Sequence, residues 1–411
     1  MLVRFVYRCI SEISWKLLYK AAVLWCGKSF FALRAFKKRL KQGIQFPPFL
    51  FFSLTNTCNL RCRGCWNVND KVSGGDLPRV DRKTELSFTE VDNIIRIAQR
   101  QGVYFYTLLG GEPFLSPEIW KIIEAHPEAY FQIITNGHFL DTSNVERLKR
   151  FGNVSPLVSI DGFEEQNDNR RGDGSFQKAM DGCKELQRQK MLYGIATVVT
   201  MQNFDSVLTE EYVQTIIDRG ALYLWYYIFR PVGTDPAVEW TLPPQTILDF
   251  RKKLLALRRK MPIIIIDTYW DAKGYAVCPA SKGMAFVIGA GGSIEPCPPL
   301  NVAADFITDN GGDFFKTMNE SQFLRRVRQR IEIQYSGTQS QGCMILDEPK
   351  ELAKLFREEN VADVSGRDLL AELETRTAKP SHYLPGSEIP EDYWVYRILK
   401  KMLFFGMGAY G

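Results

Sequence analysis

Residues 49–67 read FLFFSLTNTCNLRCRGCWN, and this stretch decides the fold of the chain. Its first eight residues, 49–56, form a nearly unbroken apolar run with the length and composition of a buried strand. Three cysteines, Cys58, Cys62 and Cys65, then follow with the spacing C-x3-C-x2-C. Thiols at such short intervals usually bind a metal centre. The sequence therefore predicts a buried strand that leads directly into a metal-binding loop.

Similar strand-like runs continue along the chain. They cover 103–110, 130–135, 155–160, 193–200 and 222–229. Helical patterns separate them, near 87–101, 116–126, 142–151, 174–191 and 209–219, and a further helix is expected at about 243–260. Apolar strands joined by helical crossovers form parallel sheets covered by helices. The pattern predicts an α/β fold, either a partial (β/α)6 barrel or an open doubly wound sheet.

The composition is that of a globular protein in a reducing compartment. The chain has 411 residues, of which 45% are hydrophobic and 24% are charged. It contains no charge-free apolar run of about eighteen residues, and its N-terminus lacks the pattern of a signal peptide. We therefore expect a cytoplasmic protein whose nine cysteines stay reduced. Cys9, Cys26 and Cys183 fall in helical segments and are expected to be small buried hydrophobes.

Residues 1–46 form a basic arm with ten Lys and Arg residues against one acid, Glu12. The whole chain has a net charge of +5, so the positive excess lies in this arm, and no nucleic-acid partner is expected. On a helical wheel one face holds Leu2, Val6, Cys9, Ile10, Ile13, Leu17, Ala21 and Leu24, and the other holds Arg4, Arg8, Glu12, Lys16 and Lys20. Such a helix either packs on the folded body or lies peripherally at the inner face of the membrane. In the second case the tail residues Trp394, Tyr396, Leu399, Leu403 and Phe404 would assist.

Two kinds of metal centre are compatible with three neighbouring thiolates. A structural zinc site needs four ligands, and the three histidines, His126, His138 and His382, are distant in sequence. A residue brought close by folding could still complete such a site. An iron–sulfur cluster is also bound by thiolates and can leave one iron to a ligand outside the protein. The spacing, together with the position at a strand end, favours the cluster.

The segment from about 49 to 230 resembles the radical S-adenosylmethionine (radical SAM) superfamily. The resemblance implies a partial (β/α)6 TIM-like barrel and a [4Fe–4S] cluster held by Cys58, Cys62 and Cys65. In that family S-adenosylmethionine chelates the fourth iron, and one electron from the cluster breaks a C–S bond to release a 5′-deoxyadenosyl radical. The radical takes hydrogen from the substrate, and a donor such as ferredoxin or flavodoxin supplies the electron. The resemblance thus implies an enzyme.

Further motifs at the predicted strand ends support the resemblance. Gly110, Gly111, Glu112 and Pro113 match the family's GGEP motif, which binds the methionine amino group. Ser159, and Arg171 or its neighbour Arg170, resemble positions that contact the carboxylate of the cosubstrate. FRPVG, at 229–233, resembles the segment that closes under the adenosine. One position departs from the family, because Gly64 stands where an aromatic residue commonly precedes the third cysteine.

A second group of cysteines, Cys278, Cys297 and Cys343, lies beyond the predicted strands. The segment between the first two resembles the start of a SPASM or twitch extension, in which a β-hairpin carries ligands of an auxiliary [4Fe–4S] cluster. A full SPASM domain has seven cysteines, so three imply a reduced version with one auxiliary cluster. The alternatives are three unpaired or buried thiols and a zinc site completed by His382.

The sequence thus predicts a basic amphipathic arm at 1–46, a radical SAM partial barrel at 47–261, a SPASM/twitch-like extension at 262–346, and helices with an aromatic tail at 347–411. Within the extension, short strands around a GAGGS turn are followed by irregular sequence up to about 345. The predicted function is hydrogen abstraction from an unactivated carbon of a lipid-linked or peptide substrate. The alternatives are a maturase of ribosomally made peptides without a built-in leader-binding domain, and a non-catalytic iron–sulfur electron carrier.

Overall fold

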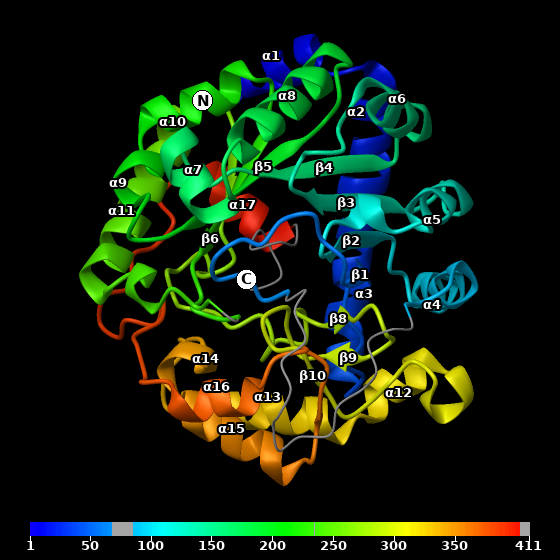
Figure 1. Cartoon of the computed structure of the whole chain (residues 1–411), viewed down its shortest axis with the longest axis vertical. Helices are drawn as coiled ribbons and strands as arrows, with labels where there is room; N and C mark the ends of the chain where they lie inside the picture. Colours follow the sequence, from blue (N-terminus) through cyan, green and yellow to red (C-terminus); the bar gives the residue numbers. More distant parts are fainter. Residues whose placement is uncertain (68–84, 234, 403–411) are drawn as a thin grey trace.

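The computed structural model describes residues 1–67, 85–233 and 235–402. Its strands follow the predicted runs: β1 Leu50–Thr55, β2 Phe105–Gly110, β3 Tyr130–Thr135, β4 Val154–Ser159, β5 Gly194–Val199, β6 Tyr223–Ile228 and a short β7 Ile264–Ile266. The helices that alternate with them are α4 Phe88–Arg100, α5 Ile119–Ala125, α6 Thr142–Phe151, α7 Glu164–Arg171, α8 Ser175–Arg188, α9 Phe204–Val207, α10 Glu210–Asp218 and α11 Pro244–Lys260. Figure 1 shows these helices on the outer side of an arc of strands.

The order of the strands identifies the sheet as a partial barrel. Neighbouring strands run β7-β6-β5-β4-β3-β2-β1, in chain order, and each pair is parallel. A doubly wound sheet starts near its centre and reverses direction. Winding without reversal, with right-handed crossovers, places the helices on one side of the sheet. The predicted α/β partial barrel is therefore confirmed.

The extension continues the barrel sheet beyond β1. The hairpin of β8 Val287–Ile288 and β9 Ile294–Glu295 is antiparallel, and β8 pairs with β1 in parallel. The predicted turn at GAGGS joins the two hairpin strands, with Gly292 in the left-handed region at φ 85°. The extension is thus built directly onto the strand that precedes the first cysteines.

The expectation of irregular sequence up to about 345 is wrong. The segment contains α12 Phe314–Glu320 and α13 Gln322–Gln334, and α14 Met344–Asp347, α15 Pro349–Glu358, α16 Leu369–Thr375 and the short pair β10 Val302–Ala303 and β11 Ala362–Asp363 complete this part. The side chains of Asp313 and Ser321 accept hydrogen bonds from the first turns of α12 and α13. α12 has only seven residues and α13 carries four arginines, so their apolar periodicity is weak in the sequence.

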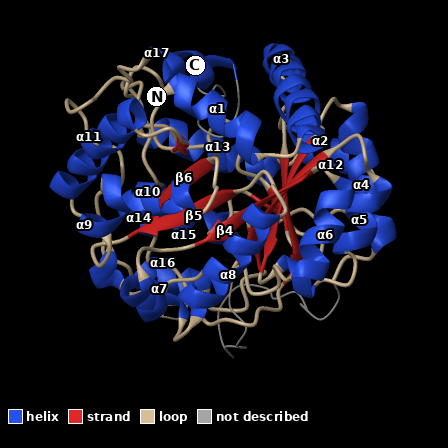
Figure 2. Cartoon of the chain, turned by 90° about the horizontal axis from the view of Figure 1, so that it is seen from above, coloured by secondary structure: helices blue, strands red, loops and turns tan. Residues whose placement is uncertain are grey.

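The N-terminal arm covers the end of the barrel where the strands begin. It consists of α1 Leu2–Glu12, α2 Trp15–Lys20, the π-helical η1 Ala21–Gly27 and α3 Lys28–Lys41. Trp25 contacts Phe105, Tyr130 and Tyr223, at the starts of β2, β3 and β6, with ring centroids 5.4 to 5.6 Å apart. Figure 2 shows α1, α3 and α17 towards one end of the molecule and α7 and α8 towards the other.

Basic side chains fasten the arm to the barrel. Arg4 donates to the carbonyl of Lys260, Arg8 to those of Pro262, Ile217 and Ala221, Lys16 to Arg150, Lys20 to Phe151, Lys28 to Glu128 and Arg39 to Gln101. Several of these carbonyls end helices, where a cation is also favoured by the helix dipole. The predicted wheel is wrong for α1, because Arg8 is buried while Val6 and Ile10 are exposed. The chain bends between α1 and α2, so the two helices do not share one continuous face.

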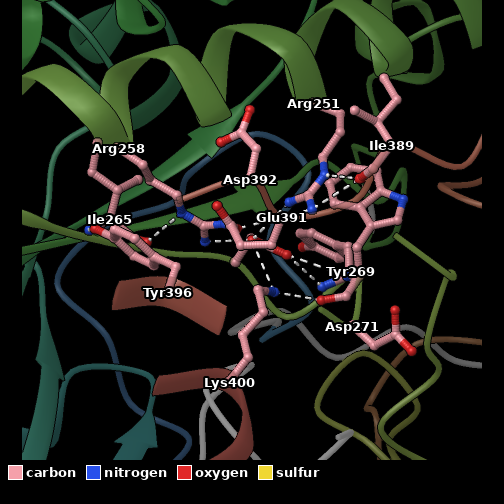
Figure 3. A network of polar contacts seen from close by, with 12 residues as sticks. Arg251, Arg258, Ile265, Tyr269, Asp271, Ile389, Glu391, Asp392, Tyr396 and Lys400 are labelled. Carbon is pink, nitrogen blue, oxygen red and sulfur yellow. Dashed lines mark hydrogen bonds and ion pairs between the residues drawn. The ribbon is translucent and has the colours of Figure 1, made fainter. Parts of the chain in front are cut away.

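The last described helix, α17 Trp394–Met402, is held by buried charges (Figure 3). Arg258 of α11 pairs with Asp267 at 2.5 Å and with Glu391 at 2.6 Å. Lys400 of α17 approaches Asp267 at 3.4 Å. These four side chains are almost completely buried, so each charge depends on its partners for stabilisation. The network therefore fixes α17 against α11 and the end of the barrel sheet.

Two expectations about exposure fail. Tyr396 is buried, and its hydroxyl oxygen accepts the Ile265 N–H at 2.8 Å. Cys26 is exposed, whereas Cys183 is buried as expected. The tail residues at 403 and 404 lie outside the described residues. No helix in the described ranges combines the length and the apolar character needed to cross a bilayer.

Candidate functional site

The loop that carries the first three cysteines is braced by the segment that follows β6. The Gly64 N–H donates to the Asp235 carbonyl at 2.7 Å, and the Arg63 guanidinium pairs with the Asp235 carboxylate at 2.7 Å. Gly233 lies so close to the Cys65 carbonyl that a Cβ would overlap its oxygen. The FRPVG segment, which is predicted to close under the adenosine, thus contacts the cysteine loop through Gly233.

A neighbouring aromatic ring leaves no room for a side chain at Gly64. Its φ is 65°, and a Cβ at this position would overlap the ring of Phe229. Phe229, the first residue after β6, is buried and packs against Trp240. An aromatic side chain is therefore present beside position 64, but it comes from the barrel rather than from the cysteine loop.

Residues 110–113 pack against the start of the cysteine loop. The N–H groups of Gly111 and Glu112 donate to the carbonyls of Thr55 and Thr57, at 2.8 and 2.9 Å. Cβ atoms at Gly110 and Gly111 would overlap the same two oxygens. Glycine is needed here because two loops of the protein approach each other at backbone distance.

Glu112 is a buried carboxyl group that ties three loops together. Its oxygens accept hydrogen bonds from the Thr135 hydroxyl and the Asn136 N–H, both at 2.8 Å. Asn136 in turn donates to Asn59 in the cysteine loop at 2.7 Å. Burial raises the pKa of Glu112 to about 7, although these hydrogen bonds favour the ionised form. A carboxyl group in this position is strongly stabilised by an incoming cation such as an ammonium group.

The raised pKa of Glu112 predicts a pH dependence of stability in the iron-free protein. The folded chain keeps this proton up to about pH 7, whereas the unfolded chain loses it near pH 4.5. The free energy of unfolding should therefore fall by up to about 3 kcal/mol through this group as the pH rises across that window. Denaturant unfolding of Glu112→Gln should show this fall removed, and the exposed Glu165→Gln should retain it. Equal pH profiles for the wild type and Glu112→Gln would contradict the raised pKa.

Two arginines share one buried carboxylate at the end of β4. Arg170 and Arg171, the last residues of α7, pair with the same oxygen of Asp161 at 2.5 and 2.7 Å. Burial would raise the pKa of Asp161, but Arg171 and Arg170 outweigh it and hold that pKa below its ordinary value. Both cations also favour the thiolate form of Cys65 electrostatically. Ser159, the last residue of β4, lies two residues before Asp161.

The three cysteines of the loop lie near one another and interact electrostatically. Cys62 raises the pKa values of both Cys58 and Cys65, although burial is the larger cause and brings the pKa of Cys58 to about 11. No three His, Cys, Asp or Glu side chains among the described residues converge tightly enough for a single ion. No disulfide forms among the nine cysteines, which all lie in the described ranges. Three neighbouring, separated thiols with cations beside them fit a larger multi-iron centre better than a structural zinc.

Comparisons with known proteins identify the family of the chain. The family model of the radical SAM superfamily matches residues 52–212. A mycofactocin maturase, MftC, of Mycobacterium ulcerans is 30% identical over 310 residues, which cover 71% of this chain and 80% of that protein. The chain belongs to the radical SAM superfamily. This radical SAM enzyme therefore uses a [4Fe–4S] cluster and S-adenosylmethionine.

One further protein and one solved structure are also similar to this chain. An AdoMet-dependent heme synthase of Methanosarcina barkeri is 29% identical to this radical SAM enzyme over 312 residues, 70% of this chain and 86% of that protein. The solved structure of Streptococcus suis SuiB bound to precursor peptide SuiA matches with a TM-score of 0.55 and 18% identity, over 72% of this chain and 70% of that chain. At this identity the structural similarity establishes the fold alone.

The second group of cysteines gathers between the extension and the barrel of the radical SAM enzyme. Cys278 precedes β8, Cys297 follows β9, and Cys343 directly precedes α14. Burial raises the pKa of Cys278 to about 11 and raises that of Cys297 well above its ordinary value, and Cys343 adds to both shifts. The three thiols grouped by sequence are thus neighbours in the fold. His382, the alternative zinc ligand, places Nε2 at 2.9 Å from the Val277 carbonyl.

Arg230 connects the barrel to this second group, a role that is not predicted from the sequence. Its Nε donates to Cys343 Sγ at 3.2 Å, and its Nη1 donates to the Ile228 carbonyl at the end of β6 at 2.6 Å. The guanidinium also lies over the ring of Tyr269, 5.2 Å from the centroid. A cation beside a thiolate that ligates a cluster would stabilise the more negative, reduced state of that cluster. The sequence signal for Arg230 is its place in FRPVG.

A hollow that is open to solvent lies between the cysteine loop and the β8–β9 hairpin. Asn56 and Trp66 line it from the cysteine loop, and Ser293, Glu295 and Asn301 line it from the extension. The buried Glu295 carboxylate accepts hydrogen bonds from Ser293 at 2.8 Å and Asn301 at 2.9 Å. Side-chain amides, a hydroxyl and a carboxylate line the hollow together with apolar groups such as Trp66, Leu109 and Val287.

Proposed function

We propose that this radical SAM enzyme abstracts hydrogen from a peptide substrate that binds in the hollow between the cysteine loop and the β8–β9 hairpin. One observation carries the proposal. The cysteine loop, the buried Glu112 carboxyl group and the Asp161–Arg170–Arg171 cluster meet where β1, β2 and β4 end. In barrels of parallel strands this face carries the chemistry. The hollow opens beside the same loop.

The proposed roles follow from the contacts. Cys58, Cys62 and Cys65 would hold the [4Fe–4S] cluster, which when bound supplies the electron that breaks the C–S bond of S-adenosylmethionine. Glu112 would bind the ammonium group of that molecule and release its proton, because its pKa is near 7. Arg171 and Ser159 would bind the carboxylate, and Gly110, Gly111 and Pro113 would keep the loop close to the cysteines. A donor such as ferredoxin or flavodoxin would reduce the protein.

Cys278, Cys297 and Cys343 would hold an auxiliary [4Fe–4S] cluster. Their mutual proximity supports this assignment, and so does the cation Arg230 at 3.2 Å from Cys343 Sγ. The residues chosen by the SPASM/twitch resemblance are therefore in a suitable arrangement. Cys297 directly precedes Pro298, which lines the hollow, and this suits a cluster that accepts an electron from the substrate after hydrogen abstraction.

Cys297→Ala is expected to remove the auxiliary cluster and leave the cluster of the loop after β1 intact. Iron in the anaerobically reconstituted protein should fall by about four atoms per chain, because one cluster loses a ligand. Release of 5′-deoxyadenosine from S-adenosylmethionine should continue, since the loop after β1 is untouched, while modified substrate is lost. The exposed Cys26→Ala is the matched control and should keep full iron content. Normal iron content in Cys297→Ala would remove the basis for an auxiliary cluster.

The hydrogen-bonding groups in the hollow, such as the amides of Asn56 and Asn301, favour a peptide over a lipid-linked substrate. The names of the relatives are compatible with it, because one is a maturase and SuiB was solved with a precursor peptide. Hydrogen transfer can be followed even for a substrate whose identity is unknown. Cells that carry the gene are grown in deuterated medium, and their peptide and lipid fractions are offered separately to the reduced protein. A mass increase of 5′-deoxyadenosine with the peptide fraction supports the proposal, and an increase with the lipid fraction alone contradicts it.

A further inference from the structure

The outer side of the arm exposes a stripe of aromatic and basic side chains. Residues 15–41 are helical without interruption through α2, η1 and α3. Trp15, Tyr19, Val23, Phe31, Arg34, Lys38 and Lys41, which we call the outer stripe, are all exposed and recur mostly at three- or four-residue intervals. Trp15, Tyr19 and Phe31 are 67%, 70% and 67% exposed, values unusual for large aromatic side chains. The aromatic residues of the outer stripe lie toward its N-terminal end, and the basic residues lie toward its C-terminal end.

Two neighbouring helices enlarge this surface. Tyr7 of α1 is 70% exposed, and Trp394 of α17 is 53% exposed. Both helices contact the end of α11, because Arg4 donates to the Lys260 carbonyl at 2.9 Å and Arg259 donates to Asp392 at 2.9 Å. Figure 2 shows α1, α3 and α17 towards the same end of the molecule. These helices lie toward the same end of the molecule, and each carries an exposed aromatic side chain.

The exposure of α17 does not result from loose packing. Lys400 and Tyr396 on its inner side are buried in the network of Figure 3, where Arg258, Asp267 and Glu391 hold them in place. Trp394 and the exposed Ile398 lie on the other side of the same helix. A helix fixed by buried charges thus keeps apolar side chains in solvent.

The charged residues of the arm indicate which kind of partner its exposed surface binds. Arg4, Arg8, Lys16, Lys20, Lys28 and Arg39 are engaged with main-chain carbonyls of the barrel. Arg34, Lys38 and Lys41 remain on the outer stripe, and the one acid of the arm, Glu12, pairs with Arg8 at 2.7 Å. Exposed aromatics beside cations match the interface of an anionic bilayer, where rings lie at the headgroups and cations meet lipid phosphates.

We infer that this face docks on an anionic membrane surface. Trp15, Tyr19 and Phe31 enter the headgroup region, and Arg34, Lys38 and Lys41 bind the lipid phosphates. A second copy of the chain is a poorer partner, because a symmetric pairing would bring two basic stripes together without acids of the arm between them. The inference does not depend on the proposed substrate.

The docking surface lies at the barrel end opposite the cysteine loop. The arm contacts the segments that precede the strands, such as the carbonyls of Phe151 before β4 and Ala221 before β6. The cysteine loop, by contrast, follows the end of β1. A membrane-bound enzyme would therefore hold its hollow away from the bilayer and receive its substrate from the aqueous side.

Co-sedimentation of the full-length protein with vesicles tests the inference. Vesicles of phosphatidylcholine with phosphatidylglycerol are compared with phosphatidylcholine alone, at low and high salt. The wild type should sediment with the anionic vesicles at low salt and be released by salt. The triple variants Trp15→Ser/Tyr19→Ser/Phe31→Ser and Arg34→Gln/Lys38→Gln/Lys41→Gln should each bind at least about tenfold more weakly. Both should still cleave S-adenosylmethionine at the wild-type rate.

Ile333→Ser is the matched control, because Ile333 is 68% exposed on α13 and lies outside this surface. It should bind vesicles like the wild type. The inference is overturned if the wild type stays in the supernatant at low salt, or if both triple variants bind as tightly as the wild type. It is also overturned if light scattering shows a dimer that the aromatic triple variant dissociates, since a second copy would then occupy the face.

Discussion

Replacing Cys58 with alanine is expected to abolish the release of 5′-deoxyadenosine and methionine from S-adenosylmethionine. Cys58 lies in the loop after β1 with Cys62 and Cys65, and loss of one of three thiolates leaves the cluster without a complete protein ligand set. Product release is measured by liquid chromatography with the reconstituted, chemically reduced protein. The expected rate is that of the reaction without enzyme.

The control for this substitution is Cys26→Ala, which removes an exposed thiol of the arm and should retain the wild-type rate. The iron-free form of Cys58→Ala should unfold at nearly the same denaturant concentration as the iron-free wild type, which separates cluster loss from misfolding. If Cys58→Ala releases 5′-deoxyadenosine at an undiminished rate, the reactive cluster belongs elsewhere and the proposed site is wrong.

Replacing Asp161 with asparagine is expected to destabilise the barrel strongly. Its carboxylate neutralises Arg170 and Arg171 at 2.5 and 2.7 Å, and all three side chains are at least 90% buried. Removing one partner of a buried ion pair leaves uncompensated charge and typically costs about 3–5 kcal/mol. Denaturant unfolding of the iron-free protein measures the loss, and iron uptake should fall because the same arginines face the cysteine loop.

An exposed pair of equal length provides the comparison. Asp235 pairs with Arg63 at 2.7 Å, but its side chain is 56% exposed. Asp235→Asn should therefore cost only about 0–1 kcal/mol, because solvent screens the pair. The difference between the two variants measures the combined effect of burial and of the second arginine at Asp161. Equal losses for Asp161→Asn and Asp235→Asn would contradict the assignment of Asp161 as the anchor of both arginines.

The strand runs and the cysteine spacings could be predicted because they are local. Six apolar runs match β1 to β6 within a few residues, since a buried strand needs a continuous apolar segment wherever the chain places it. The alternation with helices predicted a parallel sheet, but the choice between barrel and doubly wound sheet required the observed strand order. The helices α12 and α13 were missed because their burial depends on partners distant in sequence.

The candidate site also combines residues that the sequence predicts with contacts that only the fold creates. The sequence identified which residue types could bind a cluster and its cosubstrate, through motifs that each occupy a few consecutive positions. The contacts that support them join distant segments, such as Phe229 against Gly64 and Arg230 against Cys343. No local pattern encodes such contacts, because they exist only after the chain has closed.

The sequence by itself determined the fold class, the two groups of thiols and the positive charge of the arm, because composition and short-range spacing are properties of the chain alone. Only the tertiary structure decided which of those basic side chains contact the barrel and which remain in solvent. It buried Arg8 in the barrel and left Trp15 and Lys38 in solvent, since helix packing assigns each side chain to an inner or an outer face. It also placed the arm and the cysteine loop at opposite ends of the strands, because every parallel strand of a barrel points the same way.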